Sequence, residues 1–177
     1  MTQPPPELDA VLAAVPVEQR CFGWRRPAWE NQLHDLPDAR ELLGRLPERV
    51  GRASTRDVVL RELDEGRVIP PFVAVMIWGH GTTGYGPSRV RWVLTGQKGV
   101  RSYHADVRRE ELTEKLGGAV EVVRGKGAAE AYAYMYGDGR LPYLGGAFFT
   151  KWLYFASAVD GVDAEDAAPI LDQRIAG

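Results

Sequence analysis

The sequence predicts an all-α fold, on three observations. Its longer apolar runs are bounded by prolines and glycines, the residues that tend to begin and end helices. Stretches in which apolar and polar residues strictly alternate, the pattern of half-buried strands, are scarce. The 177 residues are 45% hydrophobic and 26% charged, which is the composition of a globular chain with a core rather than of a disordered one.

The N-terminal third is rich in prolines and is predicted to be partly irregular. Helices are expected in it at residues 8–15, 38–46 and 54–63. Ser54 or Thr55 is suited to cap the last of these, because a hydroxyl can accept a hydrogen bond from a first-turn N–H group. We expect residues 1–53 to form an irregular and helical segment that packs on a helical domain formed by residues 54–177.

The middle of the chain contains an apolar run from Pro70 to Trp78, closed by Gly79. Prolines at the start and a glycine at the end predict a buried helix. The run is too short for its periodicity to exclude a buried strand. A glycine-rich loop, GHGTTGYGP, follows over residues 79–87, and a further helix should begin with Ser88 as its cap.

The C-terminal half predicts a helical hairpin at residues 127–158, in which a glycine-containing turn joins two helices. The second helix of this hairpin, 147–158, is strongly apolar. A charged amphipathic helix is expected before the hairpin, at 108–116. A final helix is expected after it, from about residue 167.

The formal net charge of −2 does not indicate a nucleic-acid-binding protein, but the charge is unevenly distributed. Acidic residues are frequent near both ends of the chain. Against the single acid Asp106, residues 86–109 carry six basic residues, namely Arg89, Arg91, Lys98, Arg101, Arg108 and Arg109. This basic segment is compatible with a phosphate-binding face, because a duplex meets only one face of a protein, and equally with a solvated loop.

Several classes of protein and site are excluded by simple counts. A single cysteine, Cys21, excludes an internal disulfide and a cysteine-based zinc site. The three histidines are too scattered to predict a metal site, and no cofactor is implied. The sequence has no apolar run of about 18 residues and no basic, apolar N-terminus, so neither a transmembrane helix nor a signal peptide is expected. We therefore expect a protein of the reducing cytoplasm.

Lys151 is the most unusual residue of the apolar hairpin helix. The residues three positions away are Phe148 and Tyr154, and no carboxylate stands at a position where it could pair along the helix. Removal from water favours the neutral amine, which is the nucleophilic form. The alternative is that the side chain buries only its stem and extends its ammonium group to solvent.

Asp172 follows the sequence Pro-Ile-Leu and stands 21 residues beyond Lys151. Its position at the start of a short helix is also that of an ordinary N-cap. A carboxylate can, however, stabilise the sugar cation that forms when a glycosidic bond breaks. A neutral amine and a carboxylate together supply the two functions that such a cleavage needs.

The pattern Leu-Pro-x-x-Gly from Leu141, the lysine-bearing helix and the Pro-x-x-Asp segment ending at Asp172 resemble the helix-hairpin-helix DNA glycosylase superfamily. The sequence GGAFFTKWLYF followed by ILDQRIA is most similar to bacterial proteins described as having the 8-oxoguanine DNA glycosylase fold. The resemblance covers about residues 137–176. It implies that Lys151 forms a Schiff base, that Asp172 is the catalytic aspartate, and that the partner is double-stranded DNA containing a modified base.

Two features differ from the better-known members of the superfamily. Lys151 stands six residues beyond Gly145, where those members have their lysine two residues beyond the glycine. The difference is about one helical turn, so the side chain would keep its face but shift by about 5–6 Å along the axis. The chain also stops at Gly177, where members usually continue, so we expect a glycosylase-like fold that lacks C-terminal helices.

The resemblance also implies a pocket for a flipped-out base and a surface for the DNA backbone. Flipped bases are held between aromatic and apolar groups, and the pocket candidates are Trp78, His80, Tyr85 and Trp152. Trp78 is preferred because it adjoins the glycine-rich loop. Phosphates are bound by helix N-termini and basic side chains, and the DNA-binding candidates are Arg89, Arg91, Gly145, Gly146, Thr150 and Arg174.

Three hypotheses follow. The first is a bifunctional glycosylase, in which Lys151 displaces the base and strand cleavage by β-elimination follows. The second is a non-catalytic helix-hairpin-helix module that binds DNA, with Lys151 on a phosphate. The third is a monofunctional glycosylase that activates water through Asp172. The resemblance implies 8-oxoguanine as the base, and a phage-modified base is the alternative, with defence instead of repair as the role. The location would be the cytoplasm, in association with the nucleoid. The sequence leaves the oligomeric state open.

Overall fold

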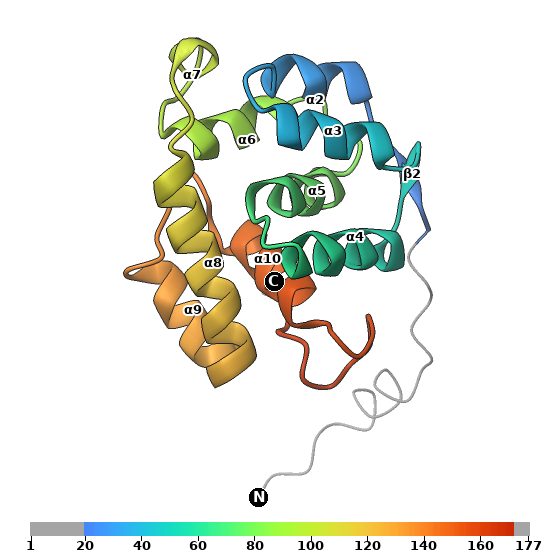
Figure 1. The fold of residues 1–177 in the computed structure, drawn as a ribbon, viewed down its shortest axis with the longest axis vertical. Helices are drawn as coiled ribbons and strands as arrows, with labels where there is room; N and C mark the ends of the chain where they lie inside the picture. Colours follow the sequence, from blue (N-terminus) through green and yellow to red (C-terminus); the bar gives the residue numbers. More distant parts are fainter. Residues whose placement is uncertain (1–19, 172–177) are drawn as a thin grey trace, which may run out of the picture.

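A computed structural model describes residues 20–171 of the chain. Within that range it is mainly helical, with nine helices and one short two-stranded sheet (Figure 1). This architecture confirms the all-α prediction. In the same range no helix combines the length and the apolar character that crossing a membrane requires. The helix predicted at residues 8–15 lies outside the described residues.

The elements follow one another with short connections. In chain order they are β1 (Phe22–Gly23), α2 (Arg26–Gln32), α3 (Pro37–Arg45), β2 (Arg49–Val50), α4 (Arg52–Asp64), α5 (Ile69–His80), α6 (Gly86–Thr95), α7 (Arg101–His104), α8 (Arg109–Lys126), α9 (Ala128–Tyr136) and α10 (Gly146–Ser157). The strands β1 and β2 pair antiparallel, with Phe22 opposite Val50.

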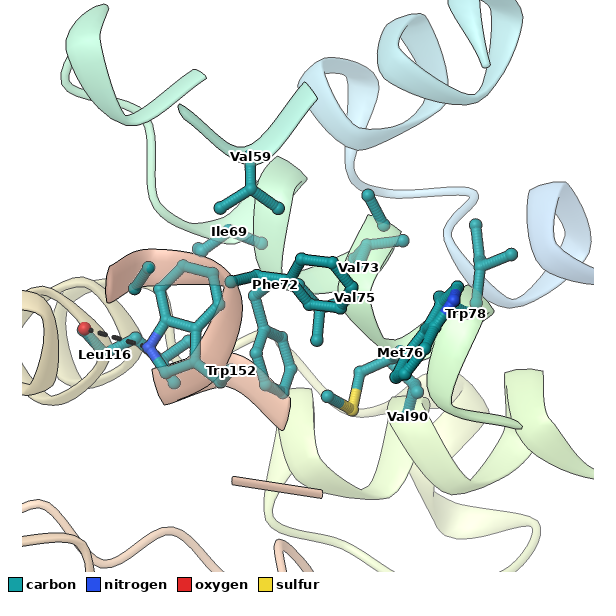
Figure 2. Close-up of a cluster of buried hydrophobic side chains, with 14 of the residues drawn as sticks. Val59, Ile69, Phe72, Val73, Val75, Met76, Trp78, Val90, Leu116 and Trp152 are labelled. Atoms are coloured by element: carbon teal, nitrogen blue, oxygen red, sulfur yellow. Dashed lines mark hydrogen bonds between the residues drawn. The ribbon is translucent and has the colours of Figure 1, made fainter. Parts of the chain in front are cut away.

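Helix α5 is the centre of the molecule. It lies in the middle of the ribbon in Figure 1 and contacts α3, α4, α6, α8 and α10. Almost all of its side chains are buried. Figure 2 shows Phe72, Met76 and Trp78 of this helix among apolar side chains of its neighbours. The apolar run is thus a helix buried on all sides, which explains why its sequence carries no periodic pattern. Pro70 and Pro71 lie in its first turn, where a missing N–H group costs no helical hydrogen bond.

The helices near the N-terminus belong to the same core. Trp29, Leu33, Leu36, Leu42 and Leu43 from α2, α3 and the turn between them are buried in the cluster that includes α5. The short β1–β2 pair joins the start of this layer to the residues just before α4. Helix α3 contacts α5 and helix α2 contacts α6, so this layer packs on the helices that also support the candidate site.

Several helix boundaries differ from the predicted ones. Helix α4 begins at Arg52, and Ser54 lies inside its first turn, where the hydroxyl accepts a hydrogen bond from the Gly51 N–H group at 3.0 Å. Helix α6 begins at Gly86 rather than Ser88. Residues 167–171 are not helical, so the final helix does not begin where it was expected.

Helix α8 is longer than predicted because its glycine pair does not end it. It continues to Lys126, with Leu112, Leu116 and Val120 buried along one side. The reason for Gly118 is close packing: a Cβ atom there would lie 2.4 Å from the Tyr134 hydroxyl of α9. The glycine thus lets α8 and α9 approach, and these two helices lie side by side in Figure 1.

Candidate functional site

The hairpin predicted at 127–158 is present as α9, a loop and α10. Leu141 and Leu144 anchor the loop in the core, while Gly145 at the start of α10 is exposed. A Cβ atom at Gly145 would meet no atom within 4 Å, so this end of the helix is open to the surroundings. The first N–H groups of a helix have no partner within it, and this helix start can therefore accept an anion.

Lys151 lies in the middle of α10 and is only 7% exposed. Its Nζ atom donates a hydrogen bond to the Ala147 carbonyl oxygen at 2.7 Å and lies 5.4 Å from the centre of the Phe148 ring. The side chain therefore lies along its own helix and does not extend into solvent.

The stem of Lys151 packs against Gly79 of α5. A Cβ atom at Gly79 would lie 3.0 Å from Cδ of Lys151 and 3.4 Å from the Phe148 ring. Gly79 was expected to end its helix, but α5 continues through it to His80. The absence of a side chain at Gly79 instead leaves space for the stem of Lys151. This role depends on the packing of α5 against α10 and cannot be recognised in the sequence.

His80 lies beside this lysine and is stacked on Phe148, with ring centres 4.3 Å apart. Tyr85 meets it edge-on from the glycine-rich loop, and a Cβ atom at Gly86 would lie 2.8 Å from the His80 side chain. Burial, followed by the positive charges of Arg89 and Lys151, lowers the pKa of His80 from 6.5 to about 4. At neutral pH His80 is therefore an uncharged ring between two other aromatic rings.

The buried imidazole should make the fold sensitive to acid. Between pH 6.5 and pH 4 the unfolded chain binds a proton at His80 that the folded chain does not, so stability falls as the pH falls. The loss should approach about 3 kcal/mol at pH 4. Chemical denaturation at several pH values, compared with His80→Gln, measures it. The difference between the two proteins should shrink on acidification. A pH-independent difference would contradict the burial of His80 as a neutral ring.

The segment after α10 returns along the helix and is tied to it by hydrogen bonds. The Tyr154 hydroxyl donates to the Val162 carbonyl oxygen, and the Ala168 N–H group donates to the Ser157 hydroxyl at 2.8 Å. Finally, the Leu171 N–H group donates to the Thr150 hydroxyl at 3.2 Å. Leu171 is the last described residue, and this bond holds it beside Thr150, which precedes Lys151 in α10. The candidates Asp172 and Arg174 lie outside the described residues.

Three of the predicted site residues lie in the core, which contradicts their predicted contacts with a base or with the DNA backbone. Trp152 is fully buried, and its indole N–H group donates to the Leu116 carbonyl oxygen (Figure 2), so it cannot face a flipped base. Thr150 is also fully buried and bonds Gly146 and Leu171 instead of DNA. Arg91 is 1% exposed, and its guanidinium group is engaged by Asp35 and backbone carbonyl oxygens inside the protein.

Of the remaining candidates, Trp78 and His80 are nearly buried, whereas Tyr85, Arg89 and Gly145 are exposed. Trp78 is mostly buried against Phe155, and its indole nitrogen has no hydrogen-bond partner. Tyr85 is 63% exposed at the end of the glycine-rich loop. Arg89 is exposed and lies over the Trp92 ring. These positions are compatible with the predicted roles of these residues at a pocket and a DNA surface.

Two residues of this region were not predicted as site residues. Phe148 precedes Lys151 by three residues, so helical spacing could have placed both on one face. Tyr143 occupies the third position of the Leu-Pro-x-x-Gly loop and lines a small hollow with His80, Arg89 and Phe148. A large aromatic residue inside a tight turn is unusual, and this feature of the sequence could have identified Tyr143 as a site candidate.

A second hollow lies beside the glycine-rich loop. It measures about 270 Å³ and is lined by Trp24, Arg25 and Trp29 on one side and by residues 81–84 on the other. The loop therefore presents its backbone next to an aromatic and a basic side chain. In the part of the chain that the structure describes, no group of three or more His, Cys, Asp or Glu residues could hold a metal ion.

Comparison with known proteins places the chain in a family. The family model described as "Putative 8-oxoguanine DNA glycosylase OGG-like protein" matches residues 15–177. This match covers the hairpin, Lys151 and the Pro-x-x-Asp segment. No curated protein and no solved structure matches the chain significantly.

Proposed function

The chain belongs to the OGG-like 8-oxoguanine DNA glycosylase family, as the resemblance implied, and we propose that it excises a modified base from double-stranded DNA with Lys151 as the nucleophile. The proposal is carried by one observation. Lys151 of α10 is a nearly buried amine packed against Gly79 of α5 and Phe148 of its own helix, close to an open helix start.

The proposed reaction begins with a flipped-out nucleotide, since an enzyme cannot reach the sugar inside a stacked duplex. After Lys151 has lost its ammonium proton, the lone pair of the neutral amine attacks C1′, a C1′–N bond to the lysine forms, and the bond to the base breaks. The base leaves with the electron pair of that bond and takes up a proton. Opening of the sugar ring then gives an imine between C1′ and Lys151, as in other amine-catalysed reactions.

Asp172 is proposed to stabilise the positive charge that develops on the sugar as the base leaves. The hydrogen bond from the Leu171 N–H group to Thr150 supports this role, since it fixes the preceding residue beside the lysine. The base itself would be an oxidised purine, as the family description suggests. Trp78, His80 and Tyr85 are the proposed contacts for it, and their aromatic rings suit a planar ligand.

The DNA backbone is proposed to bind across the hairpin and α6. The start of α10 suits one phosphate, since helix N–H groups point toward it; Gly145 is open, and a Cβ atom at Gly146 would lie 2.9 Å from the Tyr136 hydroxyl. The exposed Arg89 suits a neighbouring phosphate. Arg174, near the proposed catalytic carboxylate in sequence, would add a further cation.

A trapping experiment tests the proposal. The protein is incubated with duplexes carrying 8-oxoguanine, other oxidised bases, or hydroxymethylated and glucosylated pyrimidines as models of phage-modified bases, in the presence of borohydride. Borohydride donates a hydride to the imine and converts it to a stable amine, so a covalent protein–DNA adduct should appear with at least one of these duplexes. Cleavage of the DNA strand in the absence of borohydride would show that the protein also has lyase activity.

The two alternatives give different results in the same assay. A glycosylase that activates water through Asp172 would release the base and leave no adduct. A helix-hairpin-helix module without catalytic activity would retard every duplex in a gel and neither release a base nor form an adduct. Either result would overturn the role of Lys151 as nucleophile.

Thr150 should act as a positioning residue. Thr150→Val removes the hydroxyl that holds the Leu171 N–H group, so Leu171, the residue before Asp172 in sequence, should lose its anchor on α10. We expect the single-turnover rate of base release to fall by about 10- to 100-fold, the range that a shift of about 1 Å can produce. Affinity for the duplex should change little, and Thr150→Ser, which keeps the hydroxyl, should restore the rate. Equal rates for Val and wild type would contradict the assignment.

A further inference from the structure

Tyr143 has an unusual backbone conformation. Its φ angle is +66°, in the left-handed region, and among the described residues it is the only non-glycine residue with a positive φ. This region is unfavourable for residues with a Cβ atom, and glycine or asparagine normally occupies it. The position belongs to the tight loop of the hairpin, so glycine would fit the backbone better than tyrosine does.

The side chain of Tyr143 contributes little to the core. The residue is 45% exposed, and its ring meets the edge of Trp92 with centres 6.0 Å apart. The loop is already anchored by its buried leucines, Leu141 and Leu144. Neither the fold of the loop nor the packing of the core explains why a strained tyrosine stands here. Strained residues of this kind cluster at binding and catalytic sites.

The surroundings of Tyr143 are aromatic and positively charged. The guanidinium carbon of Arg89 lies 5.2 Å, and the Lys98 amine 5.6 Å, from the centre of the Trp92 ring. Tyr143 also borders the hollow that His80 and Phe148 line next to Lys151. An exposed ring, two cations and an open helix start are thus gathered at the edge of the proposed catalytic site.

From this arrangement we propose that Tyr143 stacks on an unstacked nucleobase of the DNA strand held by the hairpin. Arg89 and Lys98 would hold the flanking phosphates. Aromatic rings beside cations are the common means of binding bases that have left the duplex stack, since every base has a flat face. The inference rests on the proposed function, because it takes DNA as the ligand and base flipping as the event that exposes the neighbouring base.

Variants at Tyr143 can separate the contribution of its aromatic ring to DNA binding from its effect on folding. Tyr143→Gly and Tyr143→Asn suit the left-handed backbone and remove the ring, and Tyr143→Phe keeps the ring. Thermal melts should show the Gly and Asn variants to be at least as stable as wild type. Binding is measured by fluorescence anisotropy with three probes that cannot be excised: an intact duplex, a duplex with a tetrahydrofuran abasic site next to 2-aminopurine, and a single strand.

The Gly and Asn variants should bind the abasic duplex and the single strand about tenfold more weakly than wild type, while Tyr143→Phe should match wild type. The fluorescence change of 2-aminopurine on binding should disappear with the ring. Affinity for the intact duplex, whose bases remain stacked, should change less than about twofold. The salt dependence of binding should stay the same, since no charge is removed.

Two results would overturn the inference. Unchanged affinity for all three probes would show that the ring contacts no base. An equal loss on all three would indicate a backbone contact instead. Either result would leave the proposed excision intact if wild type still forms the borohydride adduct. Absence of any DNA binding by wild type, in contrast, would remove the proposed function itself.

Discussion

Arg91→Gln should lower the free energy of unfolding by about 3–5 kcal/mol, because its buried guanidinium group makes several hydrogen bonds and a bond to a charged group contributes about 1.5–3 kcal/mol. The guanidinium group donates to both carboxylate oxygens of Asp35, at 2.5 and 3.0 Å. It also donates to the carbonyl oxygens of Ser102 and Ala105, each at 2.8 Å. One side chain therefore joins α6 to the α2–α3 turn and to the segment around α7.

A shorter polar side chain cannot replace these bonds. Gln has two donors in place of five, so buried carbonyl oxygens would lose their partners without access to water. Burial alone would raise the pKa of the Asp35 carboxyl, but the hydrogen bond and charge of Arg91 outweigh burial and lower that pKa. The pair therefore stabilises the fold at neutral pH and loses this contribution as acid protonates Asp35.

The matched control is Arg89→Gln, two residues earlier in the same helix. Arg89 is exposed, so its replacement should leave the melting temperature unchanged, while Arg91→Gln should lower it by about 10 °C or more. Affinity for duplex DNA should depend on Arg89 and not on Arg91. Loss of Arg89 should weaken binding and reduce the salt slope by about one phosphate contact. Equal melting temperatures for the two variants would contradict the structural role of Arg91.

These two arginines also show what the sequence could predict. Both were predicted to bind DNA because they share a basic segment, yet positions two apart are separated by about 200° around a helix. They therefore had to face different directions, and only one could face a shared ligand. Which of the two faces inward depends on Asp35, a residue more than 50 positions away, and no local pattern contains that information.

The apolar helices show a second limit of prediction from the sequence. The hairpin and the apolar surroundings of Lys151 could be predicted because proline, glycine and one lysine interrupt runs of apolar residues. Trp78 and Trp152 both stand in such runs, and the sequence favours Trp78 for a pocket because it adjoins the glycine-rich loop. Only the packing shows that both rings belong to the core, and that Trp152 is fully buried and donates to Leu116 (Figure 2).

Replacement of Lys151 should have the largest effect on activity. Lys151→Gln and Lys151→Arg both remove the nucleophilic amine, and the second keeps the positive charge. We expect each to lower the single-turnover rate of base release by at least about 10³-fold and to abolish the borohydride adduct, as loss of a nucleophile does in other covalent enzymes. Denaturing gels with a duplex that wild type traps measure both quantities.

The interpretation depends on DNA binding being retained. Lys151 is nearly buried, so its replacement should leave the phosphate contacts of the exposed hairpin start in place. Affinity for an abasic duplex should therefore stay within about threefold of wild type for Lys151→Arg. Lys126→Gln, at an exposed lysine at the end of α8, should leave rate, adduct and affinity unchanged. If an adduct of normal yield still forms with Lys151→Gln, another amine is the nucleophile, since only a primary or secondary amine can form the imine that borohydride fixes.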